Sequence, residues 1–411
     1  MPRSDIEDQG NNHIFPNLMT TYQKAIIQPR IASYFKSSRE SGILLNLTPC
    51  ATFPNGKVHM ALLYLRSSRE SGTTRAMEIF RGKTVLITGG TGTFGKAFAK
   101  NLLEEDLVAK VIIFSRDEWK QWEMQKSHPL FQHPKIRYFL GDVRDETRLK
   151  RALSDVHYIV HAAALKQVPA AEYNPTEFIK TNIQGAMNVI NAAIDAGCEK
   201  VVALSTDKAV NPINLYGATK LCSEKLFLAA KAYVGKKGQP SFCCVRYGNV
   251  LGSRGSLLPH WEACIHGGAK ELPITDIRMT RFWITISEAV DFVKMAFART
   301  QGSEIFVPKS PSVKIVDLAT AFKPHMPHVI TGIRPGEKLH ELLISPDDAP
   351  HTVELPDAYV IIHATEEQTY PYKKLPAMHK VSENFMLASN SNSLFTAEID
   401  AIKHLLTKYH A

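Results

Sequence analysis

The feature that most constrains this fold is a regular alternation of short apolar segments with segments of helical periodicity, which begins at Lys83. Apolar runs such as TVLITGG, KVIIFSR, HYIVHAAA and KVVALS have the length of buried strands, and the stretches between them are long enough for helices. Strands separated by helices of this length form right-handed crossovers and a parallel sheet that is covered on both faces. We therefore expect an α/β fold with a doubly wound parallel sheet.

Beyond Leu251 the alternation gives way to an irregular pattern that is rich in Pro and Gly. We expect a smaller α/β C-terminal domain there, which would hold the substrate. The predicted division gives 77–250 to the sheet domain, with 290–308 returning to it through the apolar run EIFVP, and 251–411 mainly to the second domain. A last helix is predicted over 397–409.

Residues 1–76 differ from the rest because their apolar residues are scattered without a clear period, and the hexapeptide SSRESG occurs at both 37–42 and 67–72. Two copies are too few for a solenoid, in which several repeats must pack together. Met77 opens MEIFRGKTVLITGG, a natural start for the sheet domain. We expect residues 1–76 to be a disordered leader or translated upstream sequence outside the functional fold; the alternative is an N-terminal arm used in assembly.

Composition argues against several classes of protein. The net charge of +9 is spread thinly, since residues 1–76 carry nine Lys/Arg and five Asp/Glu and the other residues carry forty and thirty-five. Without a basic run or aromatic residues among basic ones, we expect no nucleic-acid partner. The six cysteines form no CxxC pair, and no run of about eighteen apolar residues occurs. We expect a cytoplasmic protein with no metal site and no membrane span, in which Cys222, Cys243 and Cys244 pack in the core.

A glycine-rich turn, TGGTGTFG at 88–95, follows the first apolar strand and opens a helix over 95–103. Glycines let the backbone turn tightly and approach a pyrophosphate, while the helix N-terminus supplies free N–H groups and the positive end of its dipole. A strand before the motif and a helix after it are the context that a dinucleotide-binding fingerprint requires. We predict a Rossmann-type cofactor site at Gly89, Thr91, Gly92, Thr93, Phe94 and Gly95.

The end of the second strand indicates which nicotinamide cofactor is bound. A carboxylate there would bind a ribose 2′-hydroxyl, but the chain has Ser115 and Arg116 first, and a guanidinium pairs well with a 2′-phosphate. This pattern favours NADP over NAD. Asp117 and Glu118 argue for NAD or for a solvated charged turn. Two residues after the third strand are expected near the adenine: Asp142 and Val143.

The run STDKAVNPINLYGATK, which ends at Lys220, carries the groups of a catalytic site directly after an apolar strand. Tyr216 and Lys220 are four residues apart, so on a helix they share one face. An ammonium beside the phenol, with the positive charge of a nicotinamide nearby, favours the phenolate and makes the tyrosine a usable base near neutral pH. We predict that Tyr216, Lys220 and Thr206, at the end of the preceding strand, are catalytic.

This trio resembles the Ser/Thr-Tyr-Lys site of the extended short-chain dehydrogenases/reductases that act on sugar nucleotides, over about 83–411. Retaining 4,6-dehydratases of that family have Thr-Asp-Glu where this chain has Thr206-Asp207-Lys208, so an amine replaces a carboxylate base. With HAAALKQVPAAEYNP, VRYGNVLGSRGS, ITDIRMTRFWIT and IRPGEKLHE, the chain closely resembles the inverting UDP-N-acetylglucosamine 4,6-dehydratases that start pseudaminic acid biosynthesis. A sister group that makes other 2,6-dideoxy sugars typically has Met at this position, so Tyr216 favours the pseudaminic acid branch.

The resemblance implies a redox-neutral loss of water. Tyr216 would remove the proton of the hydroxyl at carbon 4 while hydride leaves that carbon, and the resulting ketone acidifies the hydrogen on carbon 5. Lys208, as a neutral amine whose pKa is lowered by burial and cationic neighbours, would remove that hydrogen. Asp207, if protonated, would donate to the departing hydroxyl of carbon 6. Hydride then returns to carbon 6, and protonation of carbon 5 from the opposite face inverts that carbon.

The resemblance also implies where ligands bind. Further cofactor contacts are expected from Lys120, Ala162, Lys166, Tyr216, Lys220 and Val250. The nucleotide sugar is expected in a cleft lined by Lys166, Asn249, Arg254, Thr275 and Arg334, the last facing the diphosphate. Taken alone, each of these residues also fits a surface salt bridge. Asn182 resembles the structural active-site asparagine of the family or, alternatively, a polar residue that bends its helix.

Two other functions stay open at this level. A UDP-sugar 4-epimerase would use the same phenol and hydride chemistry without losing water. A non-catalytic scaffold would keep only the NADP-binding fold, but a binding module has no need of the Thr206, Tyr216 and Lys220 set. Because related enzymes form oligomers, the resemblance also implies a homo-oligomer.

Overall fold

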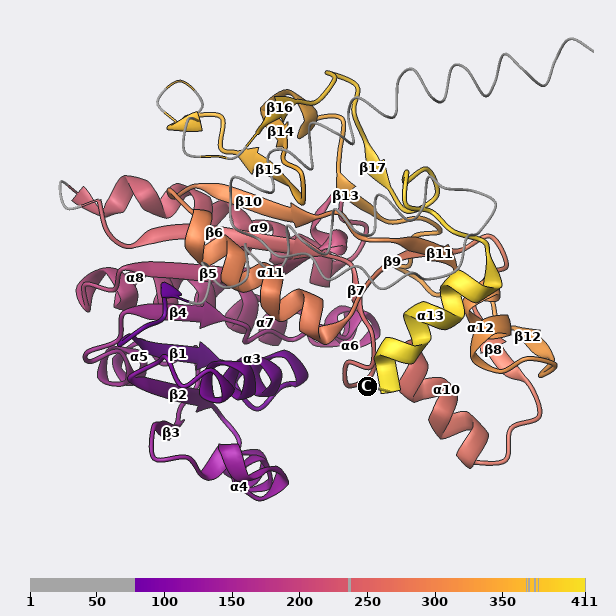
Figure 1. Ribbon diagram of the computed structural model, residues 1–411, viewed down its shortest axis with the longest axis horizontal. Coiled ribbons are helices and arrows are strands. Elements are labelled where there is room, and N and C mark those ends of the chain that lie inside the picture. Colours follow the sequence, from indigo (N-terminus) through magenta and orange to yellow (C-terminus); the bar gives the residue numbers. More distant parts are fainter. Residues whose placement is uncertain are drawn as a thin grey trace, which may run out of the picture. The chain divides into compact units, whose positions relative to one another are not determined.

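The computed structural model describes residues 78–235, 238–366, 368, 370–372, 375 and 377–410 (Figure 1). The predicted leader at 1–76, with its repeated hexapeptide and Cys50, lies outside the described residues, as does Met77. The described chain is organised around one ten-stranded sheet with the order β16-β14-β15-β10-β6-β5-β4-β1-β2-β3.

Seven neighbouring strands of this sheet run parallel. They are β3 (Ile136–Leu140), β2 (Lys110–Ser115), β1 (Thr84–Thr88), β4 (Tyr158–His161), β5 (Lys200–Thr206), β6 (Ser241–Tyr247) and β10 (Glu304–Pro308). From β1 the chain continues to β2 and β3 on one side and to β4, β5 and β6 on the other, so the strand order reverses between β1 and β4. Open α/β sheets bind ligands at such a reversal. The predicted doubly wound α/β fold is confirmed.

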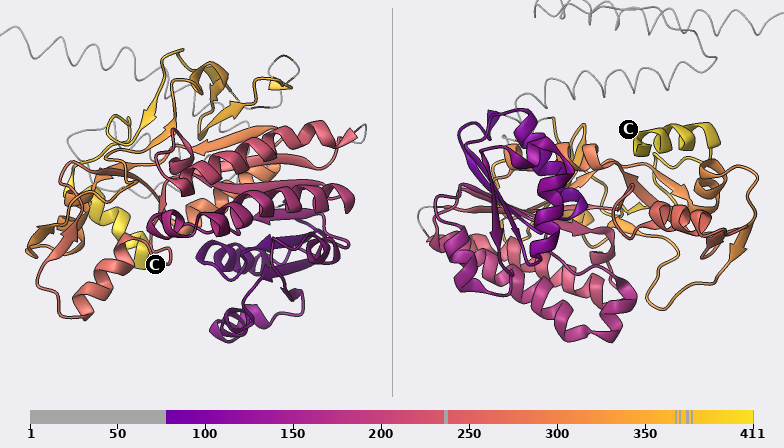
Figure 2. Two further views of the ribbon diagram at one scale, coloured as in Figure 1. Left: turned by 180° about the vertical axis from the view of Figure 1, so that it is seen from behind. Right: turned by 90° about the horizontal axis from the view of Figure 1, so that it is seen from below.

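Helices cover both faces of the sheet (Figures 1 and 2). Successive strand residues point to opposite faces, so Val85 and Ile87 pack in one core while Leu86 packs in another. The first core is closed by α3 (Thr93–Glu104) and α11 (Ile286–Arg299), with α4 (Glu118–Ser127) and η1 (Pro129–Gln132) beside them. The second is closed by α5 (Glu146–Ala152), α8 (Gly185–Asp195) and α9 (Leu215–Ala229), which continues into η4 (Ala230–Tyr233).

A second, smaller set of elements has its own apolar core, which contains Leu258, Trp261, Leu318 and Ile402. Its helices are α10 (Leu257–His266), α12 (Ile315–Phe322) and α13 (Ile399–His410). Its strands form a three-stranded sheet, β11 (Ser312–Lys314), β9 (Thr280–Ile284) and β7 (Asn249–Val250), and one pair, β12 (His328–Ile330) with β8 (Leu272–Ile274). A further pair, β13 (Leu342–Ile344) with β17 (Leu387–Ala388), packs instead in the second core of the main sheet. None of the described helices is long and apolar enough to span a bilayer.

The central sheet is larger than the sequence reading proposed. The run EIFVP forms β10 beside β6, at the place where a return to the sheet was expected. Three further strands extend the sheet in antiparallel fashion: β15 (Ala358–Ile362), β14 (Thr352–Glu354) and β16 (His379–Lys380), with η6 (Ala349–His351) before β14. These strands had been assigned to the second domain, because short segments in a Pro-rich stretch carry too little periodicity to show which sheet they join.

One core prediction was wrong. Cys243 and Cys244 are buried on β6, as expected, but Cys222 is exposed on α9. Cys222 lies two residues beyond the buried Lys220, so the helical turn carries its side chain away from the sheet.

The helical segment between β4 and β5 is interrupted. It consists of α7 (Pro175–Phe178), a π-helical turn η2 (Ile179–Gln184) and α8, and it is preceded by α6 (Val168–Tyr173). Single π-helical turns inside α-helices frequently occur at functional sites. The polar residue at the centre of this one is Asn182, which is buried.

Candidate functional site

The catalytic residues predicted from STDKAVNPINLYGATK lie together at the C-terminal end of β5. The strand ends at Thr206, and the next residues form a short 3-10 turn, η3 (Asp207–Ala209). The Thr206 hydroxyl donates to Asp207 Oδ1 over 2.9 Å, and Lys208 Nζ lies 2.9 Å from the same oxygen. Asp207 is fully buried, and its Oδ2 has no hydrogen-bond partner among the described residues. This site therefore holds a carboxylate with one oxygen still able to accept or carry a proton.

Helix α9 can approach η3 closely because of one glycine. A Cβ atom at Gly217 would collide with the backbone carbonyl oxygen of Lys208. The helix begins next to that contact, where the Asn214 side chain caps it by accepting from the Gly217 N–H over 2.7 Å. The preceding residue in the first turn is Tyr216, so the cap and the glycine place the phenol beside η3.

The phenol of Tyr216 is buried, and its burial raises the pKa of the hydroxyl above the ordinary value. The charge of Lys208 and a hydrogen bond with Thr206 lower that pKa in part, while Asp207 raises it. The sequence predicted that Lys220 is the cation that activates the phenol. In the structure Lys220 Nζ instead donates to the carbonyl oxygen of Leu204 over 2.7 Å, and Lys208 is the cation that acts on the phenol.

Lys208 was expected to have a lowered pKa, and the structure contradicts this. Burial does lower the pKa of the amine, but the charges of Asp207 and Glu341 raise it by more, so the net direction is upward. Arg281 is a cationic neighbour of the expected kind, yet it does not reverse the balance. Lys208 is therefore an ammonium paired with Asp207, and a proton must leave it before it can act as a base.

Asn182 links the π-helical turn to both ligand-binding segments. Its Oδ1 accepts from Leu165 N and its Nδ2 donates to Leu165 O, each over 2.9 Å. The same Nδ2 donates over 3.0 Å to the hydroxyl of Thr219, which donates to the carbonyl oxygen of Tyr216 over 2.8 Å. One side chain thus fixes the loop that carries Lys166 and the first turn of α9. Asn182 thus lies where the helix is interrupted and is hydrogen-bonded to both segments, while its role at an active site stays a prediction.

Cationic side chains gather in front of the Asp207–Lys208 pair. Lys208 Nζ lies 3.5 Å from Asn249 Oδ1, at the start of β7. Burial lowers the pKa of Lys166, and the charges of Lys208 and Arg254 lower it further, so these three cations are close in space. Such a concentration of positive charge is suited to a phosphate-bearing ligand.

Two other predicted substrate residues lie at the ends of a pair of strands. Thr275 follows β8 and Arg334 lies four residues beyond β12, and these strands pair in parallel with Ile274 opposite Ile330. Arg334 is exposed and its guanidinium forms an ion pair with Glu337, at 2.6 Å. The pairing places Thr275 and Arg334 near the same end of the small sheet.

A group of charged residues next to the pair was missed by the sequence reading: Arg281, Lys338 and Glu341. Lys338 Nζ donates to the carbonyl oxygen of Val210 over 2.6 Å, which ties the turn before β13 to η3. All three occur in ITDIRMTRFWIT and IRPGEKLHE, two of the segments that carry the family resemblance. Their spacing from 207 in the chain gave no reason to place them beside it.

The glycine-rich turn has the close backbone contacts that a dinucleotide site needs. Gly89 has a φ of +64°, and a Cβ there would lie 2.9 Å from the backbone of Ala163, in the loop that follows β4 with Ala162. A Cβ at Gly95 would lie 2.5 Å from the Cα of Gly90. Gly92 stands at the N-cap of α3 and no side chain caps that helix, so its first N–H groups are free for an anion.

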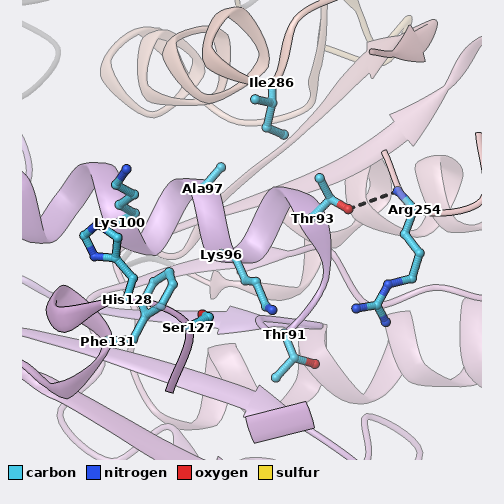
Figure 3. A pocket seen from close by; sticks show the side chains of 10 residues that line it. All are labelled: Thr91, Thr93, Lys96, Ala97, Lys100, Ser127, His128, Phe131, Arg254 and Ile286. Carbon is cyan, nitrogen blue, oxygen red and sulfur yellow. Dashed lines mark hydrogen bonds between the residues drawn. The ribbon is translucent and has the colours of Figure 1, made fainter. Parts of the chain in front are cut away.

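A cavity of about 410 Å³ opens beside this helix, between α3, the η1 segment and the start of α11 (Figure 3). Lys96 and Arg254 reach toward its Thr91 end in the close-up. The backbone N–H of Arg254 donates to the Thr93 hydroxyl over 3.1 Å, and Phe94 stacks on Phe98 behind the turn. The predicted residues Thr91, Thr93 and Arg254 therefore line one space together.

The end of β2 has the arrangement expected for recognition of the adenosine half. Ser115 is buried and accepts a hydrogen bond from Gln121, whereas Arg116 is half exposed and lies 3.8 Å from Asp142. Asp117 is already engaged, because its side chain caps α4 by accepting from Lys120 N and pairs with Lys120 Nζ at 2.8 Å. The remaining predicted cofactor positions are the exposed Glu118, the buried Val143, the half-buried Ala162 after β4 and the half-buried Val250 of β7.

The described part of the chain contains no cluster of side chains suited to a metal ion. No group of three His, Cys, Asp or Glu side chains within it is placed to hold a metal ion. The clustered carboxylates at the site, Asp207 and Glu341, are instead paired with the cations named above.

Known proteins share this sequence and this fold. A family model described as "Polysaccharide biosynthesis protein" matches residues 85–363. A protein from Campylobacter jejuni serotype O:2 named UDP-N-acetylglucosamine 4,6-dehydratase (inverting) is 52% identical over 330 residues, which cover 79% of this chain and 98% of that protein. A UDP-glucose 4-epimerase from Rickettsia massiliae is 43% identical over 290 residues, or 69% of this chain and 84% of that protein.

Solved structures agree with this assignment. The structure of Pen from Bacillus thuringiensis has a TM-score of 0.72 and 34% identity, and the match covers 80% of this chain and 99% of that one. A dTDP-glucose 4,6-dehydratase from Streptomyces venezuelae, solved with NAD and TYD bound, has a TM-score of 0.55 and 24% identity over 62% of this chain and 86% of that one, which supports the fold alone. With a family model that covers more than half of its length, this chain belongs to the polysaccharide biosynthesis protein family of the extended short-chain dehydrogenases/reductases.

Proposed function

We propose that this protein is a UDP-N-acetylglucosamine 4,6-dehydratase that inverts carbon 5 and produces UDP-2-acetamido-2,6-dideoxy-β-L-arabino-hex-4-ulose, the first step of pseudaminic acid biosynthesis. The name and identity of the Campylobacter jejuni protein support the activity. The observation that carries the proposal is the Asp207–Lys208 pair, 2.9 Å apart and directly beside Tyr216. This pair supplies an acid and a base that an oxidation at carbon 4 alone does not require.

The residues at the cofactor end fit a nicotinamide dinucleotide, and we propose NADP. The close contacts of Gly89 and Gly95 and the uncapped start of α3 fit a pyrophosphate. Asp117, which would favour NAD, is held in the cap of α4, whereas the half-exposed Arg116 is available for a 2′-phosphate. When bound, the cofactor supplies a reversible hydride acceptor and a positive charge next to the phenol.

The first proton moves to Tyr216. Its phenolate takes the proton from the hydroxyl at carbon 4 and becomes the phenol, and the charge of Lys208 with the Thr206 hydrogen bond stabilises the phenolate that begins the step. The ketone formed at carbon 4 acidifies the hydrogen on carbon 5. Oxidation therefore prepares the substrate for the residues on η3.

The Asp207–Lys208 pair then acts as one unit. Transfer of a proton from the ammonium to the carboxylate, across 2.9 Å, creates a neutral amine and a carboxylic acid at once. Exclusion of water by the substrate favours this neutral form, because two charges lose their hydration. Lys208 removes the hydrogen of carbon 5 as a proton, and Asp207 donates its proton to the hydroxyl that leaves carbon 6 as water.

The Asp207–Lys208 pair ends the reaction in its starting protonation state. Lys208 has gained one proton and Asp207 has lost one, so the pair is again an ammonium and a carboxylate. Tyr216 has also gained one proton, and transfer of that proton to carbon 5, from the face opposite to Lys208, restores the phenolate. No net proton is gained or lost by the chain, which agrees with a reaction whose only net change is the loss of water.

The nucleotide sugar is expected to bind across both sets of elements. Lys166 and Arg254 supply positive charge near the pair, and Asn249 fixes the position of Lys208. Arg334 and Thr275, at the ends of β12 and β8, would hold the diphosphate and nucleoside. For Arg334 to do so, its guanidinium must exchange Glu337 for a phosphate oxygen.

A UDP-sugar 4-epimerase is the second candidate, since a UDP-glucose 4-epimerase is also a relative. An epimerase needs Tyr216 and hydride transfer but has no leaving group to protonate. The buried Asp207 beside an amine base has no assigned use in that reaction. The two candidates differ by one water molecule in the mass of the product.

The decisive experiment uses Lys208→Ala and Asp207→Asn with UDP-N-acetylglucosamine and no added cofactor, followed by mass spectrometry and proton NMR at carbon 5. We expect the wild-type protein to form the 4-keto-6-deoxy product with inverted carbon 5, and each variant to lose about 10²-fold or more of that activity. An isomer of unchanged mass would establish the epimerase instead. Full dehydration by both variants would refute the assigned roles.

We further propose that the enzyme is cytoplasmic and works as a homo-oligomer. The five described cysteines carry free thiols, which suits a reducing compartment. The oligomer is proposed from the resemblance to related enzymes, and light scattering at several concentrations will test it.

A further inference from the structure

A second buried carboxylate, Glu341, lies next to the catalytic pair and takes no part in the steps above. It is 2% exposed and directly precedes β13, a strand that packs against η3. Its Oε1 lies 3.9 Å from Arg281 Nη2, and its Oε2 lies 3.7 Å from Lys338 Nζ. Both distances exceed a hydrogen bond, and Oε2 has no hydrogen-bond partner among the described residues. A buried carboxyl with an unsatisfied oxygen is costly for stability alone, so its presence calls for another explanation.

Hydrogen bonds hold the segment that carries Glu341 next to η3. Lys338 Nζ donates to Val210 O over 2.6 Å, immediately after η3. The Arg281 guanidinium donates to the carbonyl oxygens of Lys338 and Leu339, over 2.9 and 3.2 Å. The turn that ends in Glu341 is therefore held against η3 by backbone contacts, which keep the distance between the carboxyl group and the pair constant.

Charged and titratable groups face the pair from several elements. Asp207 and Lys208 come from η3, and the others are Tyr216 of α9, Lys166 after β4, Arg281 of β9, and Lys338 and Glu341 before β13. The cations outnumber the carboxylates. This excess of positive charge would strip a proton from the pair, and Glu341 is the group that counteracts it.

We propose that Glu341 is a positioning residue for the dehydration step, whose negative charge keeps one shared proton on the Asp207–Lys208 pair at neutral pH. The inference rests on the proposed function, because the pair works only with that single proton. With none it has no acid, and with two it has no base. Burial, and to a lesser degree Asp207, raise the pKa of Glu341 by more than its three cationic neighbours lower it, so the net direction is upward; as a carboxylate, Glu341 in turn raises the pKa of Lys208.

The sign of the effect follows from this charge. Removing a negative charge near the pair lowers the proton affinity of both members, so the pair loses its proton at a lower pH. In Glu341→Gln the alkaline limb of the kcat profile should move to lower pH by about half a pH unit or more. KM for the nucleotide sugar should change by less than about twofold, since Glu341 does not touch it. Glu341→Asp keeps the charge and should restore most of the wild-type profile.

A direct measurement of Lys208 separates this inference from the proposed function. Acetic anhydride acetylates neutral amines, and peptide mapping by mass spectrometry across pH gives the titration midpoint of Lys208 in the full-length protein without any substrate. We expect the midpoint to fall in Glu341→Gln and to rise in Lys338→Met, which removes a cation. Glu354→Gln is the matched control: Glu354 pairs with Lys309 on the edge of the sheet and should leave the midpoint unchanged.

The outcomes are distinguishable. An unchanged midpoint in Glu341→Gln would overturn the inference, even if the wild-type enzyme dehydrates its substrate and the midpoint shifts in Lys338→Met. A shifted midpoint together with no wild-type turnover of UDP-N-acetylglucosamine would overturn the proposed function and leave the charge coupling in place. If Glu341→Gln fails to fold, Glu341→Ala, which also removes the charge, is measured in its place, and an unchanged Lys208 midpoint in that variant would overturn the inference.

Discussion

The cofactor end and the catalytic end of this protein reach their geometry by different means. The glycine-rich turn at 88–95 is continuous in sequence, and its shape depends on backbone atoms that nearly touch, such as those of Gly95 and Gly90. The catalytic cluster combines residues from 207–220 with residues from 281–341, and charged side chains hold it together. The first region should fail when an atom is added, and the second when a charge or proton is removed at constant volume.

The largest effect is expected from Tyr216→Phe, which tests whether the catalytic end depends on chemistry rather than on packing. The ring remains in its buried place, but the hydroxyl that exchanges the proton with carbon 4 is lost. We expect kcat to fall by about 10²–10⁴-fold, with the melting temperature nearly unchanged. Tyr233→Phe, on an exposed tyrosine, should leave both unaffected. Near-normal turnover by Tyr216→Phe would remove the phenol from the mechanism.

Arg116→Ala tests the part of the cofactor end that does depend on a side chain. Loss of a charge-assisted contact to a 2′-phosphate should weaken NADP binding by about 10–100-fold and leave NAD binding close to its wild-type value. Titration calorimetry with both dinucleotides measures the two affinities. Arg151→Ala, on the exposed side of α5, serves as the control. Equal weakening of both cofactors would show that Arg116 does not read the phosphate.

Gly95→Ala adds one methyl group where the backbone of Gly90 leaves no room. We expect a loss of about 1–3 kcal/mol in the free energy of unfolding and weaker binding of the dinucleotide, because α3 must move away from the turn. Urea denaturation and cofactor titration measure these effects. Gly267→Ala, at the end of α10, has its nearest contact at 3.3 Å and should cost much less. Similar losses in the two variants would contradict the close-approach argument.

The smallest effect is expected from Arg334→Ala. Arg334 is well exposed and already paired with Glu337, so its contact with a diphosphate should contribute only about 1 kcal/mol. KM for UDP-N-acetylglucosamine should rise about fivefold while kcat stays the same. Arg278 is equally exposed and paired with Asp276, so Arg278→Ala controls for the loss of a surface cation. An identical KM in the two variants would remove Arg334 from the substrate site.

The sequence alone determined the parts whose pattern is local. Apolar runs marked the parallel strands, TGGTGTFG marked the turn before α3, and the spacing of Tyr216 and Lys220 placed them on one helix. These conclusions depend on backbone preferences and short-range periodicity, which are written in consecutive residues.

Only the tertiary structure decided which distant groups share the site and what their charges do. Glu341 and Arg281 are far from Lys208 in the chain, yet they help to set its pKa, and their presence reversed the expected direction. The antiparallel strands β14 to β16 and the exposure of Cys222 likewise became visible only after packing. The physical reason is that Coulomb energies and burial depend on separation in space, which no local pattern of residues encodes.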